Sequence, residues 1–201
     1  VEVANLSNKA ETMTLSVSGI QDGIQVNAKV TVGNRVLNQE LFSVTPILQS
    51  NIMKSVMKEV DIVSSVELQK DTIIKVEIGL KVGNSYEYLN YGNYVVYSCE
   101  RQEDDRSYFI IAYDKMIYSM KQNEEFNVTY PVTIKNYLSA LATKIGLTLK
   151  NTTFYNQNQL INSELYAGLG YTYRDILDEI AQAGGGFIII HADDELEVIY
   201  P

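Results

Sequence analysis

The chain has 201 residues, and 46% of them are hydrophobic, which is enough to fill the core of one large domain or two small ones. No apolar run reaches the roughly 18 residues that cross a bilayer, so we expect no membrane span. The formal net charge of −9 argues against a protein that wraps DNA, because phosphate binding needs clustered Lys and Arg side chains.

The first third of the sequence has the pattern of β-strands. Apolar and polar side chains alternate over residues 13–17 and again over residues 24–30, as in half-buried strands. A glycine-bearing turn at 21–23 joins them into a predicted hairpin. A second turn at 33–34 precedes a strand predicted around residues 36–44.

The pattern changes briefly in the middle of the β-rich part. Apolar side chains between Ile52 and Met57 form one stripe, which predicts a short helix within residues 46–57. Strands return over residues 60–68. They are clearest over residues 72–82, where every second side chain is apolar.

A tyrosine-rich strand and an apolar strand follow. The first covers residues 86–100, where Gly92 indicates a bulge. The second covers residues 108–114, beyond a charged tip, and its side chains are expected to alternate between the two faces of a paired strand. Asp114-Lys115 then turns the chain out of the sheet.

Helical periodicity begins after residue 130. Thr133 is placed to cap a helix that Gly146 ends. Thr172 opens a second helix and forms a capping box with Asp175. The remaining elements expected here are a short strand and a hairpin, at residues 147–150 and 187–200.

These elements predict an α+β fold. We expect a β-rich, barrel-like N-terminal part, followed by a small α/β part with two helices on short strands. The expected domains are a β-hairpin segment, a β-rich domain and an α/β domain, at residues 1–45, 46–126 and 127–201. The first segment carries no pattern that we identify, and we expect it to be an insert or a truncated upstream domain.

The only histidine of the chain lies in an acidic turn. His191 could hold a divalent cation together with Asp193, Asp194 and Glu195. The same residues also fit a solvated hairpin turn, and one turn supplies fewer ligands than a protein metal cage needs. We therefore predict no metal site and no cofactor.

Other conspicuous residues are interpreted as structural. The glycines at 184–186 follow a helix instead of preceding one, so they fit a helix C-cap and not a phosphate-binding loop. The single cysteine, Cys99, lies in a strand pattern and is expected to be a small buried side chain. Asp114-Lys115 is interpreted as an exposed ion pair, and the acids at 103–105 as an exposed tip. No catalytic residue is predicted.

Several segments carry a more specific pattern, in a fixed order. They are YEYLNYGNYVVYSCERQEDDRSYFIIAYDKMIYSM, TYPVTIKNYLSALATKIGLTL, LYAGLGYTYRDILDEIAQAGG and DDELEVIY. In this order they resemble the tail-tip hub proteins of siphophages and prophages of Gram-positive bacteria, which are similar to the baseplate hub of contractile phages. The strand ending in AYDKM and the helix opening LGYT-x-RD-x-L are the most specific parts. The resemblance covers about residues 48–201.

The resemblance implies a virion structural protein that is not itself an enzyme. Such a hub forms a ring, usually a homotrimer, that links the tail tube and distal tail proteins to a tail fibre or lysin. It is assembled in the host cytoplasm and lets phage DNA pass at infection without specific binding. Some members of the family carry a C-terminal lysin. The acidic balance of the chain agrees with a lumen that must not hold DNA.

Two other functions stay open on the sequence. A tail-associated cell-wall peptidase or hydrolase would need a cleft that joins His191 or paired acids to a nucleophile, and the sequence has no GxSxG motif. A receptor- or carbohydrate-binding module could use the 15 tyrosines as contact platforms, although the chain has no tryptophan.

Overall fold

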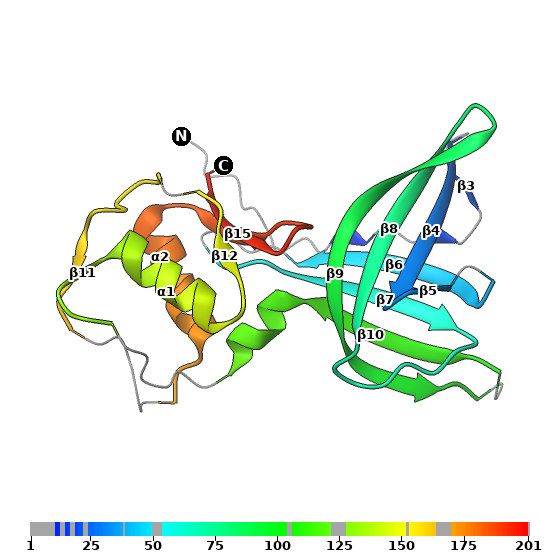
Figure 1. Cartoon of the computed structure of the whole chain (residues 1–201), viewed down its shortest axis with the longest axis horizontal. Coiled ribbons are helices and arrows are strands. Elements are labelled where there is room, and N and C mark those ends of the chain that lie inside the picture. The colour runs from blue at the N-terminus through cyan, green and yellow to red at the C-terminus, as the bar shows by residue number, and fades with distance from the viewer. Residues whose placement is uncertain are drawn as a thin grey trace, which may run out of the picture. The chain divides into compact units, whose positions relative to one another are not determined.

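Figure 1 shows the computed structural model of the chain. The residues that it describes are 11–12, 15–16, 19–21, 24–37, 39–49, 54–103, 106–121, 128–151, 153–163 and 170–200. The chain forms two compact units. The sheet unit consists of Thr12–Leu48 and Lys58–Asp114, and the helical unit of Val1–Glu11, Gln49–Met57 and Lys115–Pro201. This division differs from the three consecutive segments expected from the sequence, because each unit gathers segments that are separated along the chain.

The main sheet follows the order β1-β6-β7-β10-β9-β8-β4-β3, with β2 paired to β6 and β5 paired to β4. Every ladder in it with a described register is antiparallel. Its strands are β1 (Glu11–Thr12), β2 (Leu15–Ser16), β3 (Gly19–Gln21), β4 (Ile24–Val32), β5 (Arg35–Leu37), β6 (Leu41–Gln49), β7 (Met57–Ser64), β8 (Ile73–Val82), β9 (Ser85–Arg101) and β10 (Tyr108–Asp114). Since β4 pairs with β8, the strands described within the first 45 residues share this sheet with later strands.

A β-rich α+β fold is confirmed, but the expected barrel is not found. The path of paired strands has two ends, at β1 and β3, and no ladder between the described strands joins them. Alternating side chains predict which face of a strand is buried. Closure depends instead on strand number, tilt and shear, which follow from pairings between distant segments.

The strand pattern of the sheet unit agrees with the sequence over its central part. The alternation over residues 24–30 becomes β4, and that over 72–82 becomes β8. The bulge expected near Gly92 is present, because the register between β8 and β9 shifts between Val76 and Glu77. The hairpin predicted over 13–30 includes residues outside the described ones, its turn at 22–23 among them.

The helix predicted within residues 46–57 is wrong. Its first residues belong to β6, and its last residue begins β7. Residues 50–53 lie outside the described part. Ser55 instead forms a parallel bridge with Ile188, and the backbone N–H of Val56 donates to the Ile188 carbonyl at 2.7 Å. A few apolar residues over six positions fit an extended segment as well as one helical turn.

The helical unit contains the two predicted helices. Thr133 caps α1 by accepting a hydrogen bond from the Asn136 amide, and Thr172 and Asp175 form the predicted capping box of α2. The bounds of its elements are η1 (Lys115–Met120), β11 (Val132–Thr133), α1 (Ile134–Lys144), β12 (Thr148–Leu149), β13 (Leu160–Ile161), α2 (Tyr173–Gly184), β14 (Phe187–Ile190) and β15 (Glu195–Ile199). β12 runs parallel to β15, β15 is antiparallel to β14, and β11 pairs with β13.

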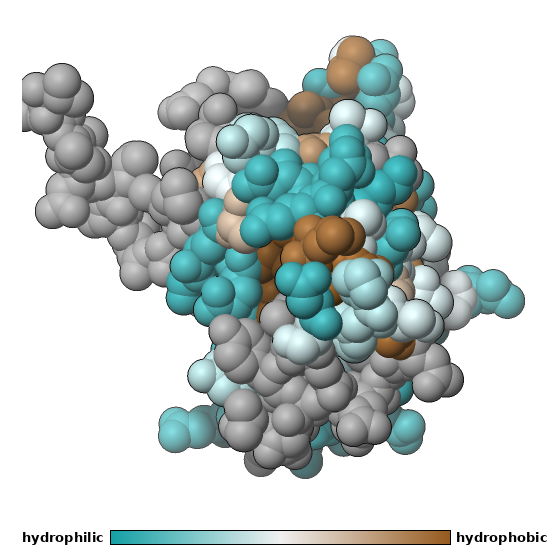
Figure 2. All heavy atoms as spheres, turned by 90° about the vertical axis from the view of Figure 1, so that its left-hand side faces the viewer, coloured by the Kyte–Doolittle hydropathy of each residue, from teal (hydrophilic) through white to brown (hydrophobic). Residues whose placement is uncertain are grey.

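One hydrophobic core holds the helical unit together. The apolar face of α1 is buried against α2, with Leu138, Leu141, Ile176 and Leu177 fully inaccessible. Figure 2 shows a mostly hydrophilic face of this unit, on which a smaller hydrophobic area is surrounded by polar side chains. Within the described residues, no helix combines the length and apolar character that crossing a membrane requires.

Candidate functional site

The strand-end pair Asp114-Lys115 is not the exposed ion pair that the sequence indicated. Asp114, the last residue of β10, is only 3% exposed. Its Oδ2 accepts a hydrogen bond from the backbone N–H of Lys58 at 3.1 Å. Lys115 pairs with Asp194, with 2.8 Å between Nζ and Oδ2. The sequence marked the end of the strand correctly but gave no sign of partners that lie far away along the chain.

The surroundings of Asp114 favour a structural role. The rings of Tyr91 and Tyr94 stack with 6.0 Å between centroids, and burial raises the pKa of the Tyr94 hydroxyl. Burial also lowers the pKa of the half-buried Lys58, while the charge of Asp114 acts in the opposite direction. The carboxylate therefore compensates a buried amide and a partly desolvated cation.

A second polar cluster joins α2 to the extended segment at Ser55. Oδ1 of Asp178 accepts hydrogen bonds from the Ser55 amide at 2.7 Å and from its hydroxyl at 2.5 Å. Nη2 of Arg174 donates to the Ser55 carbonyl at 3.1 Å. Arg174 and Asp178 lie one helical turn apart, so one face of α2 binds both backbone groups of Ser55. We call these three residues the Ser55 clamp.

The sequence did not reveal the Ser55 clamp. Arg174 stands in the LGYT-x-RD-x-L segment, which was identified only as a family marker. The available signal was the spacing of Arg174 and Asp178 on one helix face, but their partner lies more than a hundred residues earlier.

The acidic turn around His191 is occupied by internal ion pairs. Nε2 of His191 contacts the Glu197 carboxylate, and Nζ of Lys150 lies 3.6 Å from the same group. Asp194 is paired with Lys115, as described above. Asp193 is exposed, and Glu195 begins β15. No group of three or more His, Cys, Asp or Glu side chains in the described part of the chain is arranged to hold a metal ion.

The glycines after α2 act as a helix cap and a tight turn, as predicted. Gly185 adopts the left-handed conformation with φ +68°, and its N–H donates to carbonyls in the last turn of α2. A Cβ on Gly186 would lie 2.5 Å from the Ile199 carbonyl oxygen in β15. Only glycine allows the chain to pass so close to this strand.

Replacing Gly186 with alanine is therefore expected to lower the free energy of unfolding by about 2 kcal/mol, because a backbone carbonyl would have to move. Urea denaturation measures the effect. The matched control is Ala183→Gly, which removes a Cβ at an exposed position near the same helix end and should cost less than about 1 kcal/mol. Equal stability of Gly186→Ala and wild type would contradict the close approach.

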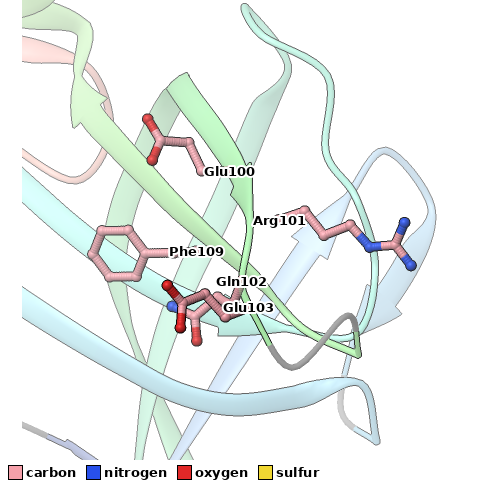
Figure 3. A pocket seen from close by; sticks show the side chains of 5 residues that line it. All are labelled: Glu100, Arg101, Gln102, Glu103 and Phe109. Carbon is pink, nitrogen blue, oxygen red and sulfur yellow. The ribbon is translucent and has the colours of Figure 1, made fainter.

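A shallow depression of about 470 Å³ lies at the tip of the β9–β10 hairpin. It is lined by Glu100, Arg101, Gln102, Glu103 and Phe109 (Figure 3). Figure 3 shows the Arg101 side chain pointing away from the carboxylate of Glu100. None of these side chains is a nucleophile with a base beside it, so the lining does not form a catalytic arrangement.

Three other residues near this tip were conspicuous in the sequence. Asp104 and Asp105 lie outside the described residues. Cys99 is a free, half-buried cysteine in β9 that packs against the core of the sheet unit, which fits its interpretation as a small apolar side chain.

Two acids on one face of β7 are held in an unfavourable setting. Burial and the neighbouring charge of Asp61 raise the pKa of Glu59, and burial raises the pKa of Asp61. Tyr113 lies directly across from Glu59 in β10. A carboxyl whose pKa is higher in the folded state binds more protons there than in the unfolded chain, so stability falls as pH rises through that window.

We therefore expect Asp61→Asn to stabilise the protein by about 0.5 kcal/mol at pH 7, since it removes one of two like charges. The gain should disappear as pH falls towards about 4, where both carboxyls of the unfolded chain become protonated. Urea denaturation from neutral to acidic pH tests this. Asp193→Asn, an exposed substitution, is the control. Parallel pH profiles for wild type and Asp61→Asn would contradict the expectation.

The fold of this chain is similar to that of two tail proteins of known structure. It is similar to the 43 kDa tail protein of prophage MuSo2 from Shewanella oneidensis, with a TM-score of 0.57 and 11% identity over 86% of this chain and 53% of that chain. It is also similar to a tail protein from Neisseria meningitidis MC58, with a TM-score of 0.56 and 14% identity over 86% of this chain and 50% of that chain.

These likenesses establish a shared fold at low sequence identity. The chain spans about half the length of each of the two tail proteins. No family model matches the sequence, and no curated protein matches it.

Proposed function

We propose that the chain is a structural subunit of a phage or prophage tail, and that it forms part of the hub at the tail tip or baseplate. The observation that carries this proposal is the fold, which matches two tail proteins over most of this chain. The order of segments in the sequence supports the hub role specifically. That the host is a Gram-positive bacterium stays a prediction from the sequence.

The polar clusters support a scaffold better than an enzyme. Asp114, Asp178 and Lys115 each bind groups of the chain itself. Charged groups that are used in this way hold elements in place and are not available to a substrate. Neither the peptidase nor the glycan-binding alternative gains a specific observation from the described residues.

In the proposed role, the subunit assembles as a homotrimer in the host cytoplasm and resides in the virion. Its partners are the tail tube, the distal tail proteins and a tail fibre or lysin. Phage DNA passes through the ring without specific binding. The net charge of −9 suits that passage, because DNA is repelled by an acidic lining.

Electron microscopy of tails tests the role directly. Virions carrying an epitope tag on this chain would be labelled with an antibody and imaged in negative stain. We expect label at the tip or baseplate end of the tail and nowhere else. Label along the tube or on the capsid would count against the hub. Virions without any label at the tip or baseplate would also count against it.

A further inference from the structure

The outer end of the β8–β9 hairpin combines an open strand edge with exposed apolar side chains. We call Glu77–Val82 of β8 and residues 85–91 of β9, which lie beyond the bulge, the arm. Figure 1 shows the hairpin reaching past the end of β4.

One edge of the arm has no strand beside it in the described part of the chain. β8 pairs with β4 as far as Leu80, whereas β9 pairs with β10 only from Tyr94 onwards. Gly83 and Asn84 form a two-residue turn, so Val82 and Ser85 are a hydrogen-bonded pair. The alternation of an antiparallel ladder then directs the backbone N–H and C=O groups of Tyr86 and Tyr88 away from β8.

On one face of the arm, the side chains contact other residues of the same chain. The Tyr88 ring covers Gly79, where a Cβ would come within 2.8 Å of it, and the Tyr88 hydroxyl accepts a hydrogen bond from Asn27 at 3.1 Å. Lys29 lies 4.7 Å from the centre of this ring and pairs with Glu77 at 2.6 Å. These contacts fix the arm, so a partner would meet a preformed strand.

The opposite face carries exposed apolar side chains from both strands, together with Glu87 and Ser85, which lie across from Leu80 and Val82. Directly opposed residues of a ladder share a face, which places Leu80, Val82 and Leu89 together. Their exposed fractions are 39%, 52% and 66%. This face continues the side of β8 that buries Ile74 and Val76 completely in the core. The same sheet face is therefore covered at one end and uncovered at the other.

We infer that a second copy of this chain covers the arm, by adding a strand along residues 85–89 and packing apolar side chains on Leu80, Val82 and Leu89. A row of unpaired backbone groups accepts an extended strand and little else. Among the described strands the path of the sheet ends at β1 and β3, so each copy can offer a strand edge at a different place from the arm. A contact between two different surfaces is the kind that closes a ring.

The size of the arm predicts a weak pairwise contact. Three apolar side chains and a short strand fall below the roughly 800 Å² per partner of a stable two-protein interface. In a closed ring each subunit makes two such contacts, which strengthens the assembly. The inference rests on the proposed function, because a tail hub requires repeated contacts between identical subunits.

Sedimentation velocity of the chain over a range up to millimolar concentration tests the inference. We expect reversible self-association of wild type. Leu89→Lys, which places a charge on the apolar face, should weaken it about tenfold or more. Tyr86→Pro, which removes one outward N–H, should also weaken it. The control is Leu160→Lys, a residue of the helical unit with 54% exposure, which should associate like wild type.

Two results would overturn the inference. One is wild type that stays monomeric throughout the range, and the other is association that the arm variants and the control variant share equally. Circular dichroism shows whether each variant is folded, and the two arm variants act through different groups. The labelling of tails tests the hub role separately. If the label lies at the tip but the arm variants associate like wild type, the arm is not the contact between copies and the proposed function still stands.

Discussion

Replacing Asp178 with alanine is expected to lower the free energy of unfolding by about 3 kcal/mol. Ser55 is 3% exposed, and the carboxylate of Asp178 accepts hydrogen bonds from both its amide and its hydroxyl. Without the carboxylate, two buried donors lose their acceptor, and each unsatisfied group costs about 1–3 kcal/mol. Urea denaturation followed by circular dichroism measures the loss.

Three variants separate the parts of the Ser55 clamp. Asp178→Asn keeps an acceptor oxygen and is expected to cost about 1 kcal/mol. Arg174→Ala removes the donor to the Ser55 carbonyl and is also expected to cost about 1 kcal/mol. Asp193→Ala, at an exposed turn, should stay within about 0.5 kcal/mol of wild type. If Asp178→Ala were as stable as Asp193→Ala, the clamp would have no role in stability.

Features that depend on neighbouring residues were predictable from the sequence. Thr133 and the Thr172–Asp175 pair carry their own helix-start signals, and both operate as caps. The alternation over residues 72–82 likewise specifies a strand, since the period of two is visible within the segment itself. In these elements the physical cause lies within a few positions of the effect.

Features that depend on distant segments were not predictable. The apolar residues up to Met57 suggested a helix, but pairing of Ser55 and Val56 with Ile188 holds that segment extended. The alternation of β8 also gave no indication that Leu80 and Val82 would lie beyond the core. Which side chains a strand buries depends on the strands beside it, and that pairing is set far along the chain.

The candidate site shows the same limit. His191 and the strand-end Asp114 attracted attention because of their residue type and position. The structure places each against a partner that the sequence does not bring near it, Glu197 across a turn and Lys58 in another strand. These charged side chains bind backbone and charged groups of the chain itself, which supports the proposed scaffold role. We therefore expect the function of the chain to lie in surfaces such as the arm.

Replacing Asp114 with alanine is expected to cost about 3 kcal/mol in the sheet unit. The change removes the acceptor of the Lys58 amide and leaves a half-buried ammonium without the opposing charge. Asp114→Asn keeps an acceptor but loses the charge, so we expect about half that loss. Chemical denaturation at neutral pH measures both, with Asp71→Asn at an exposed position as the control.

A double-mutant cycle decides why Asp114 is needed. If the carboxylate compensates the charge of Lys58, then Lys58→Met should recover about 1 kcal/mol or more of the stability lost in Asp114→Asn. If Asp114 acts only through the backbone N–H of Lys58, the two losses should add, because Lys58→Met leaves that amide unchanged. Additive losses would thus reject the charge-compensation argument while keeping the hydrogen bond that fixes β7 at the end of β10.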